Sequence, residues 1–488
     1  MKQRSLRLVL AITAALAFSC QAANAHVPNT SLTVSTQPGL VPDFNPGVHD
    51  YVTRCGPAGK LTVSVNAPRR SWVFVDGWFP RSGSFSKSVA LAEGQRFAIT
   101  VLGPGWRVST YHVRCLPLDF PSFTSQRTGR TQAQWYVVAP FSGGPPEVSR
   151  NYVAIFDSNG APVWWYRAKT QPLDAKLLAN GNIGWLQYNE TEMLQAGADE
   201  IRLNGSPVRH VDTIGGGADH HELQLLRNGN YLLAKYPVLR GVDLSACGGP
   251  ADGAIYDNEL QEISPDGSLV WSWKASDHFS AADVSPRWRD RCTATSPADI
   301  YHFNSAEPDR GGYVVSLRHL DAIVRINRRD GTIDWKLGGP QRAESLTPIG
   351  DPGLAVDGFG GQHDARILSD GTLTLHDNGT RTARPPRAVR YRLDLRSRTA
   401  TLIEDVRDAA VSFSGCCGSA RRLTGGNWVT SWGGQPFITE LTGAGLPVFR
   451  LTFTQNMFSY RAQPVEPGRL GVTALRRGMD EMHPRSRR

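Results

Sequence analysis

Gln362-His363-Asp364-Ala365-Arg366-Ile367-Leu368-Ser369-Asp370-Gly371-Thr372-Leu373 is the stretch that decides the fold, because its form recurs along the chain. It consists of a histidine, alternating apolar residues and a polar–glycine turn that leads into another apolar run. His221 opens a second copy, His302 a third that is one residue longer, and Cys417 a fourth. In a ring of repeated units an equal register means an equal radius. These opening side chains are therefore expected to share one site.

A second recurring pattern is a hairpin in which an apolar-x-apolar strand, a polar–glycine turn and a further strand follow one another. Its copies cover residues 155–164, 201–208, 263–271, 326–335, 391–403 and 439–448. Two hairpins make a four-stranded sheet, and radial repetition of such sheets is a β-propeller. The sequence therefore predicts an all-β protein in which residues 131–465 form a six-bladed β-propeller. We expect the strand near 135–139 to complete the last blade and close the ring.

The residues before and after the repeats predict separate segments. In residues 27–118, short alternating runs lie between Gly and Pro clusters, as expected for a small β-sandwich. The pattern resembles the cadherin-like bacterial sandwich, and we interpret this domain as one of packing or positioning. Residues 466–488 are predicted to be a basic, solvated C-terminal tail. The largest insertion among the repeats lies between Trp273 and Ile300.

The first 25 residues have the form of an export signal. Basic residues precede an apolar run over 8–18, and Ala23-Asn24-Ala25 is a small-x-small cleavage site. We expect cleavage near Ala25 and a periplasmic or secreted protein. Cys20 hints at a lipoprotein, but the residues before it are a poor lipidation context. An uncleaved anchor is disfavoured because the apolar run is too short to span a bilayer, and no membrane span is predicted elsewhere.

Six cysteines remain after removal of the signal, and an even number in an exported chain favours disulfides. The expected pairs are Cys55 with Cys115, Cys247 with Cys292, and the adjacent Cys416 with Cys417. The last pair would form a strained vicinal ring, and its alternative is two free thiols near the channel.

The formal charge of +9 makes the protein mildly basic. Basic clusters are not combined with aromatic residues in a nucleic-acid-binding pattern, so no nucleic-acid partner is predicted. A basic surface helps to collect anionic substrates. The oligomeric state is left open by the sequence, a homodimer included.

The inner strands of a propeller line its channel, where His221, His302 and His363 are expected to meet. Asn304 follows His302 by two residues and so shares its face of a strand, and Arg318 lies in the neighbouring hairpin. This set has no carboxylate pair and no serine nucleophile. A neutral imidazole nitrogen can attack, and an arginine can hold oxygens whose charge rises during transfer. Phosphoryl and sulfuryl transfer both fit, and neither demands a metal.

Four motifs together resemble bacterial arylsulfate sulfotransferases over residues 150–460: Gln362-His363-Asp364, His376-Asp377-Asn378-Gly379, His302-Phe303-Asn304-Ser305 and 333–339. The resemblance implies a six-bladed propeller that moves sulfate from a phenolic sulfate ester to a phenolic acceptor without the nucleotide donor PAPS, hence with no cofactor. It implies that His363 is the nucleophile, transiently sulfated on a ring nitrogen. It also implies that sulfuryl oxygens are bound by the remaining residues of the set, with histidines moving protons: His221, His302, Asn304 and Arg318.

Two other functions stay open. One is a non-catalytic propeller that binds an anionic ligand or a protein in its channel. The other is a metalloenzyme with His221, His302 and His363 as ligands of Zn²⁺ or Cu²⁺.

The remaining polar residues are interpreted as structural. His278, His319 and His376 lie outside the register and are expected to be structural or surface residues. The segment 377–379 is interpreted as a turn. Asp364 is expected to point away from its neighbour His363 and is given no role. Of the adjacent pair at 220 and 221, the register favours His221.

Overall fold

The computed structural model describes residues 32–55, 59–142, 151–188, 197–454 and 456–485. Strands dominate these residues and the helices are short, so the predicted all-β class is confirmed. The chain forms two compact units, one that ends at Leu118 and also includes Arg485, and one from Asp119 to Pro484. The expected signal over residues 1–25 lies outside the described residues.

The first unit consists of two sheets that share one hydrophobic core. One sheet contains, in order, β1 (Thr33–Gln37), β4 (Lys60–Asn66) and β6 (Ser84–Ala90). The other contains β2 (Leu40–Val41), β3 (Asp50–Arg54), β8 (Val108–Leu116), β7 (Arg96–Leu102) and β5 (Trp72–Val75), and η1 (Pro104–Trp106) precedes β8. Alternate residues of β4 are buried, as expected for strands with one face on a core. The predicted disulfide between Cys55 and Cys115 is present.

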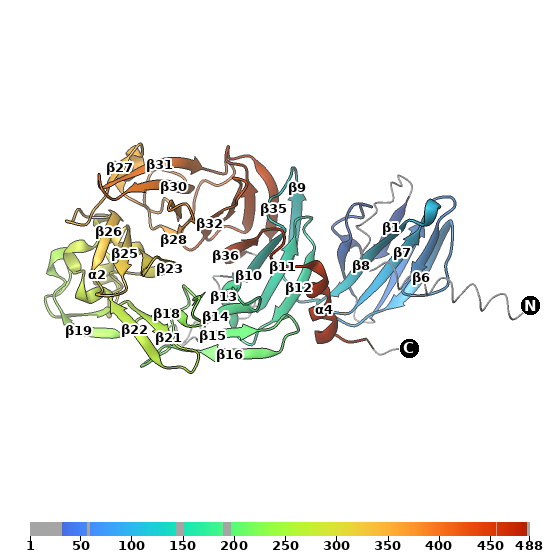
Figure 1. Cartoon of the computed structure of the whole chain (residues 1–488), viewed down its shortest axis with the longest axis horizontal. Coiled ribbons are helices and arrows are strands. Elements are labelled where there is room, and N and C mark those ends of the chain that lie inside the picture. Colours follow the sequence, from blue (N-terminus) through green and yellow to red (C-terminus); the bar gives the residue numbers. More distant parts are fainter. Residues whose placement is uncertain (1–31, 56–58, 143–150, 189–196, 455, 486–488) are drawn as a thin grey trace, which may run out of the picture. The chain divides into compact units, whose positions relative to one another are not determined.

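In the described part of the second unit, six sheets of four or five strands follow one another around a common centre (Figure 1). Written from the strand nearest the centre, the first three are β36 (Met457–Val465), β10 (Trp135–Ser142), β11 (Tyr152–Asp157), β12 (Pro162–Arg167); β13 (Gln171–Leu177), β14 (Ile183–Tyr188), β15 (Ala198–Ile201), β16 (Pro207–Val211); and β17 (Gln224–Leu225), β18 (Tyr231–Lys235), β21 (Glu259–Ile263), β22 (Leu269–Lys274). The next three are β23 (Phe303–Asp309), β24 (Gly312–Leu317), β25 (Ala322–Asn327), β26 (Ile333–Gly338); β28 (His363–Ile367), β29 (Leu373–Asp377), β30 (Arg387–Asp394), β31 (Thr399–Val406), β27 (Thr347–Ile349); and β32 (Ser419–Arg422), β33 (Trp428–Ser431), β34 (Phe437–Leu441), β35 (Pro447–Phe453), β9 (Phe123–Arg127). A two-stranded sheet joins β19 (Val238–Val242) to β20 (Gly253–Tyr256).

Both repeated sequence patterns form antiparallel hairpins. The segment 155–164 forms the outer pair β11–β12, and 326–335 forms β25–β26. The segment that opens with His363 forms the inner pair β28–β29, whose turn requires the left-handed conformation that Gly371 adopts at φ 80°. Inner strands of neighbouring sheets contact one another, as β23 does with β28 and β13 with β36. Residues that open the histidine segments are thereby brought to the centre.

The two ends of the second unit complete each other's sheets. Strand β36 pairs with β10, where Val137 lies opposite Gln463. Strand β9 pairs with β35 in the last sheet, where Arg127 lies opposite Phe449. The strand at 135–139 therefore helps to close the ring, but the prediction that it completes the last sheet is wrong, because β9 occupies that position.

Part of the expected C-terminal tail is a helix. Helix α4 (Val472–Met482) contacts β12, and Leu475 and Met479 on one of its faces are fully buried. Residues spaced by four positions share a helix face, so a short amphipathic helix explains this burial. The prediction of a solvated tail is therefore wrong over residues 472–482.

The insertion before Ile300 folds over the β23–β26 sheet as short helical segments: η4 (Ala275–Asp277), η5 (Ala281–Asp283), η6 (Pro286–Trp288) and α2 (Arg291–Ala294). The predicted disulfide between Cys247 and Cys292 ties it to η3 (Ser245–Cys247). Two further short helices are η7 (Arg318–Leu320) and α3 (Pro352–Asp357). Trp288 is 1% exposed and packs in the same hydrophobic core as strands β23 to β25.

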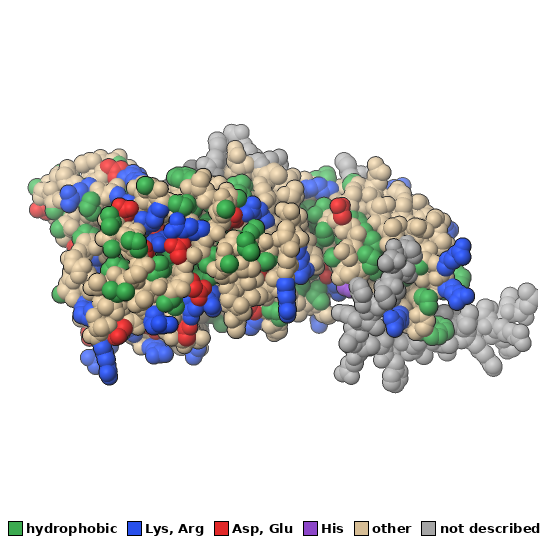
Figure 2. Space-filling model, turned by 90° about the horizontal axis from the view of Figure 1, so that it is seen from above, with side chains coloured by type: hydrophobic (Ala, Val, Ile, Leu, Met, Phe, Trp, Pro, Cys, Tyr) green, Lys and Arg blue, Asp and Glu red, His purple; other side chains and the backbone are tan. Residues whose placement is uncertain are grey.

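Basic and acidic side chains are interspersed on the face drawn in Figure 2. The net positive charge therefore does not gather into one continuous band on that face. Within the described ranges, every helix is too short or too polar to cross a bilayer.

Candidate active site

His363 begins β28 and is almost fully buried, with 2% of its surface exposed. Its Nδ1 lies 2.9 Å from the carbonyl oxygen of Gly361 and 2.8 Å from Oδ1 of Asn378, so Nδ1 carries the proton and donates. Nε2 is left as an acceptor, and the backbone N–H of Cys417 donates to it at 3.1 Å. Burial first, and then the charge of Arg318, hold the pKa of His363 well below its ordinary value. The ring is therefore neutral at neutral pH.

Asn378 connects this ring to the loop before β32. Its Nδ2 donates to Oγ of Ser414 and to the carbonyl oxygens of Cys416 and Cys417 at 2.8, 3.1 and 2.9 Å. Since three acceptors surround Nδ2, Oδ1 is the amide atom that faces His363. The interpretation of residues 377–379 as a turn did not predict the hydrogen bond between Asn378 and His363.

Arg318 lies at the start of η7 and is held from three sides. Its Nη1 donates to Nε2 of His319 at 2.9 Å, and its Nη2 donates to the carbonyl oxygen of Gly415 at 3.1 Å. The guanidinium carbon lies 4.3 Å from the ring centroid of Trp288. Nε is buried and has no hydrogen-bond partner within the described ranges. A donor of this kind is available to an anionic group.

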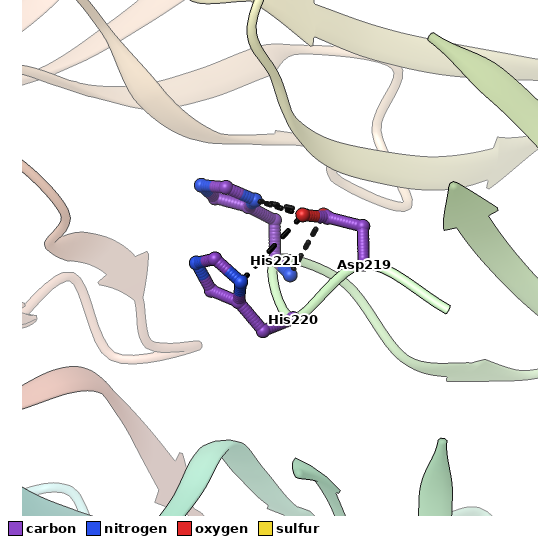
Figure 3. Close-up of side chains that lie close together, drawn as sticks. All are labelled: Asp219, His220 and His221. Carbon is purple, nitrogen blue, oxygen red and sulfur yellow. Dashed lines mark hydrogen bonds and ion pairs between the residues drawn. The ribbon is translucent and has the colours of Figure 1, made fainter. Parts of the chain in front are cut away.

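His221 and His220 stack on each other beside Asp219 (Figure 3). Nδ1 of His221 donates to the Asp219 carboxylate at 2.7 Å, whereas Nδ1 of His220 lies 3.6 Å from it. The His221 ring also lies 5.2 Å from the ring of His302. Burial, followed by the nearby His221, lowers the pKa of His220 to about 3. His221, the residue favoured by the register, is therefore the one of the pair whose ring packs edge-on against His302.

His302 adopts a positive φ of 53° and donates from Nδ1 to the carboxylate of Asp299. Its ring lies 4.6 Å from that of His319, which is only 2% exposed. Burial lowers the pKa of His302, although Asp299 acts in the opposite direction. His319 was expected to be a structural or surface residue, and the structure places it in the interior, where it contacts both His302 and Arg318.

Asn304 is fully buried on β23. Its Nδ2 donates at 2.7 Å to the carbonyl oxygen of Gln362, the residue before His363. Its Oδ1 has no hydrogen-bond partner in the described part of the chain. The amide donor of Asn304 therefore holds the backbone at the start of β28.

Cys416 and Cys417 are both free thiols in the structure, in place of the expected vicinal disulfide. A hydrogen bond from Cys417 lowers the pKa of the Cys416 thiol, with help from the charge of Arg318. The corresponding hydrogen bond raises the pKa of Cys417 well above its ordinary value. The two thiols therefore differ in their tendency to ionise.

A family model described as arylsulfotransferase (ASST) matches residues 188–454 of the chain. This range is more than half of the 488 residues. The protein belongs to the arylsulfotransferase family. The resemblance identified in the sequence is thereby confirmed, and the matched range includes His221, His302, Arg318 and His363.

No curated protein matches the sequence. Among solved structures, a protein of unknown function from Bacteroides caccae is 14% identical with a TM-score of 0.44, and the alignment covers 68% of this chain and 99% of that one. Catalytically inactive virginiamycin B lyase from Staphylococcus aureus with quinupristin is 10% identical with a TM-score of 0.34, over 68% and 99% of the two chains. A gluconolactonase from Xanthomonas campestris is 12% identical with a TM-score of 0.31, over 68% and 89%.

Groups that could hold a metal ion in this arylsulfotransferase-family protein differ from the three histidines expected. In the part of the chain that the structure describes, one such group is Asp219 with His220 and His221, and another is Asp299 with His302 and His319. His363 belongs to neither group.

A buried network of charges lies among the inner strands next to the histidines. Asp364 bonds to Arg366 and Arg421, and Glu222 bonds to Arg366 and Arg461. Burial alone would raise the pKa of Asp364, but Arg421 and Arg366 outweigh it and hold that pKa below its ordinary value. No role in the chemistry was expected for Asp364, and its carboxylate joins β28 to β32 within this network.

Sequence reasoning missed Asp219, Asp299, His319, Asn378 and the Cys417 N–H. Asp219 could have been identified from the sequence, because it precedes His221, the histidine that the register favours, by two residues. His319 directly follows the predicted Arg318. Asp299 lies in the insertion, where no repeat defines a register.

Proposed function

We propose that this protein is an exported, PAPS-independent aryl sulfotransferase that moves a sulfuryl group between phenols through a sulfohistidine at His363. One observation carries the proposal. The His363 ring is neutral and is held at Nδ1 by two acceptors, so the lone pair of Nε2 has a fixed direction. A neutral imidazole nitrogen of this kind is a competent nucleophile.

In the first half-reaction, Nε2 of His363 attacks the sulfur of a phenolic sulfate ester, the N–S bond forms, and the bond between sulfur and the phenolic oxygen breaks. The leaving phenolate takes a proton from the ring of His221 or His302, each of which has a carboxylate partner at Nδ1. The guanidinium of Arg318 stabilises the negative charge on the sulfuryl oxygens.

In the second half-reaction, a phenolic acceptor gives its proton to the same imidazole, its oxygen attacks sulfur, and the N–S bond breaks. His363 is then regenerated, so the cycle is ping-pong and needs no cofactor. We assign oxygen binding to Arg318 together with His221 and His302. Asn304 was expected to bind oxygens as well, and its Oδ1 is an acceptor, so it would assist through its hold on the β28 backbone.

The proposal includes the domain organisation and the location. The six sheets are interpreted as a six-bladed propeller over residues 131–465, preceded by a β-sandwich over 27–118. A cleaved signal over 1–25 would deliver the protein to the periplasm or the medium. The disulfides Cys55–Cys115 and Cys247–Cys292 support an oxidising compartment.

The test is transfer from 4-nitrophenyl sulfate to phenol by the full-length protein and by His363→Asn. The proposal predicts turnover by the unchanged protein and its loss in the variant, with an unaltered melting temperature. The matched control is His278→Asn, since the His278 ring stacks on Trp273 away from the imidazole cluster. Unchanged turnover in His363→Asn would reject the assigned nucleophile.

A second candidate, a metal-dependent activity, is favoured by the carboxylates at Nδ1 of His221 and His302. Metal-ligating histidines usually donate their other ring nitrogen to such a partner. Metal analysis of freshly purified protein, and activity before and after chelation, distinguish the two candidates. Stoichiometric Zn²⁺ or Cu²⁺ whose removal abolishes turnover would favour the metalloenzyme.

A further inference from the structure

The insertion between Trp273 and Ile300 carries a carboxylate that contacts two of the clustered imidazoles. Oδ2 of Asp299 accepts a hydrogen bond from Nδ1 of His302. The backbone carbonyl of Asp299 accepts one from Nδ1 of His319 at 2.6 Å, and this Nδ1 also lies 3.7 Å from Oδ2. Oδ1 of Asp299 is buried without a hydrogen-bond partner in the part of the chain that the structure describes.

His319 in turn forms a hydrogen bond with Arg318. Because Nδ1 of His319 donates to a carbonyl, Nε2 of the neutral ring is an acceptor, and Nη1 of Arg318 donates to it at 2.9 Å. Burial and the nearby His302 hold the pKa of His319 well below its ordinary value, so the ring stays neutral. With Gly415 at Nη2 and Trp288 against its face, the guanidinium has one defined orientation.

We propose that Asp299 is a positioning residue for sulfuryl transfer. Its carboxylate fixes the Nδ1–H form of His302, and its backbone carbonyl fixes that of His319, whose Nε2 accepts from Arg318. This inference rests on the proposed function, since the groups that Asp299 positions are those assigned to the sulfuryl group. Trp288 comes from the same insertion, so the segment tied down by the Cys247–Cys292 disulfide is part of the site.

The experiment compares Asp299→Ala with Asp219→Ala, the same change at the carboxylate that accepts from His221. In full-length protein without ligand, the side-chain ¹⁵N signals of His302 distinguish the Nδ1–H form from the Nε2–H form of the neutral ring, and they are assigned by their loss in His302→Gln. We expect the unchanged protein and Asp219→Ala to hold His302 in the Nδ1–H form, and Asp299→Ala to populate the Nε2–H form. Asp299→Asn keeps an acceptor oxygen and should restore the Nδ1–H form.

The kinetic readout uses 4-nitrophenyl sulfate and phenol. Asp299→Ala should lower kcat by about 10² and change KM less, and Asp299→Asn should restore part of the loss. Melting temperatures show that each variant is folded. An unchanged Nδ1–H form of His302 in folded Asp299→Ala overturns the inference even if the unchanged protein is active. A changed form in a protein that transfers no sulfuryl group instead supports the positioning and rejects the proposed function.

Discussion

The backbone nitrogen of Cys417 lies 3.1 Å from Nε2 of His363 and donates a hydrogen bond to it. The carbonyl of the same Cys417 accepts from Asn378, whose Oδ1 faces the other nitrogen of the ring. Nε2 of His363 is therefore bonded directly to the loop before β32. Nδ1 is linked to the same loop through the side-chain amide of Asn378. A sulfuryl group on Nε2 would replace the Cys417 N–H at the lone pair and leave that N–H within reach of a sulfuryl oxygen.

The contact between Asn378 and Nδ1 of His363 predicts a pH effect. A carboxylate in Asn378→Asp would favour the imidazolium form and raise the pKa of His363 by about 1 to 3 units. Since only the neutral ring attacks, the acid limb of kcat/KM should move upward by that interval. Asn378→Ala removes the acceptor without adding charge and should slow the reaction without this upward move. An acid limb that stays in place in Asn378→Asp would contradict the account.

The three-sided hold on Arg318 predicts that lysine cannot replace it. An ammonium group lacks the planar fork that reaches His319 and Gly415 together while stacking on Trp288. Arg318→Lys should lower kcat by about 10² to 10³, the usual cost of losing one donor to a developing anion. Arg381→Lys is the control, because Arg381 also stacks on Trp288 but is exposed and paired with Asp290. Equal rates for the two variants would argue against a catalytic Arg318.

The opposite pKa shifts of the adjacent thiols predict selective alkylation. The lowered pKa of Cys416 gives it the larger thiolate fraction near neutral pH, and the thiolate is the reactive form. Limited iodoacetamide should label Cys416 before Cys417 and inactivate the enzyme, since Arg318 and His363 lie beside this loop. Peptide mass spectrometry gives the order of labelling, and Cys416→Ser should resist inactivation. Preferential labelling of Cys417, or recovery of a linked Cys416–Cys417 peptide, would contradict the free-thiol arrangement.

The buried charge network predicts a large cost when one partner is lost. Arg366 is 3% exposed and bonds to Glu222, Asp364 and Glu307. Arg366→Met should reduce the free energy of unfolding by about 3 to 5 kcal/mol, because it leaves buried carboxylates with fewer partners. Urea denaturation measures this. Arg477→Ala, which removes an exposed pair with Glu481, should cause no measurable change.

The same network gives stability a pH dependence of known sign. The folded pKa of Asp364 lies below its unfolded value, so its contribution is present above the unfolded pKa of about 4 and is lost as the pH falls. The urea midpoint of the unchanged protein should therefore decline below about pH 4.

Repetition explains why much of this arrangement could be predicted from the sequence. A polar–glycine turn between alternating strands is a local signal, and the equal register of His221, His302 and His363 carried information about their common radius. The segments that opened with these residues all formed inner hairpins of their sheets.

Residues outside the repeats could not be placed in this way. Asp299 reaches His302 only because the insertion folds back over a sheet, and Asn378 reaches His363 only across paired strands. Asp364, where φ is 58° and the β28–β29 register shifts, bonds to Arg366 and Arg421 rather than to His363, as expected for its neighbour in the strand. Helix α4 is short and was not predicted. The four-residue spacing of the apolar Leu475 and Met479 is the sequence signal that indicates it.

The measurement that tests the central claim most directly is the intact mass of the full-length protein, and of His363→Asn, after brief exposure to 4-nitrophenyl sulfate. The account predicts that the unchanged protein gains the mass of one sulfuryl group, carried by His363, and that phenol removes it. The variant should gain nothing. Release of nitrophenol with no mass gain, or a sulfuryl group found on a different residue, would contradict transfer through His363.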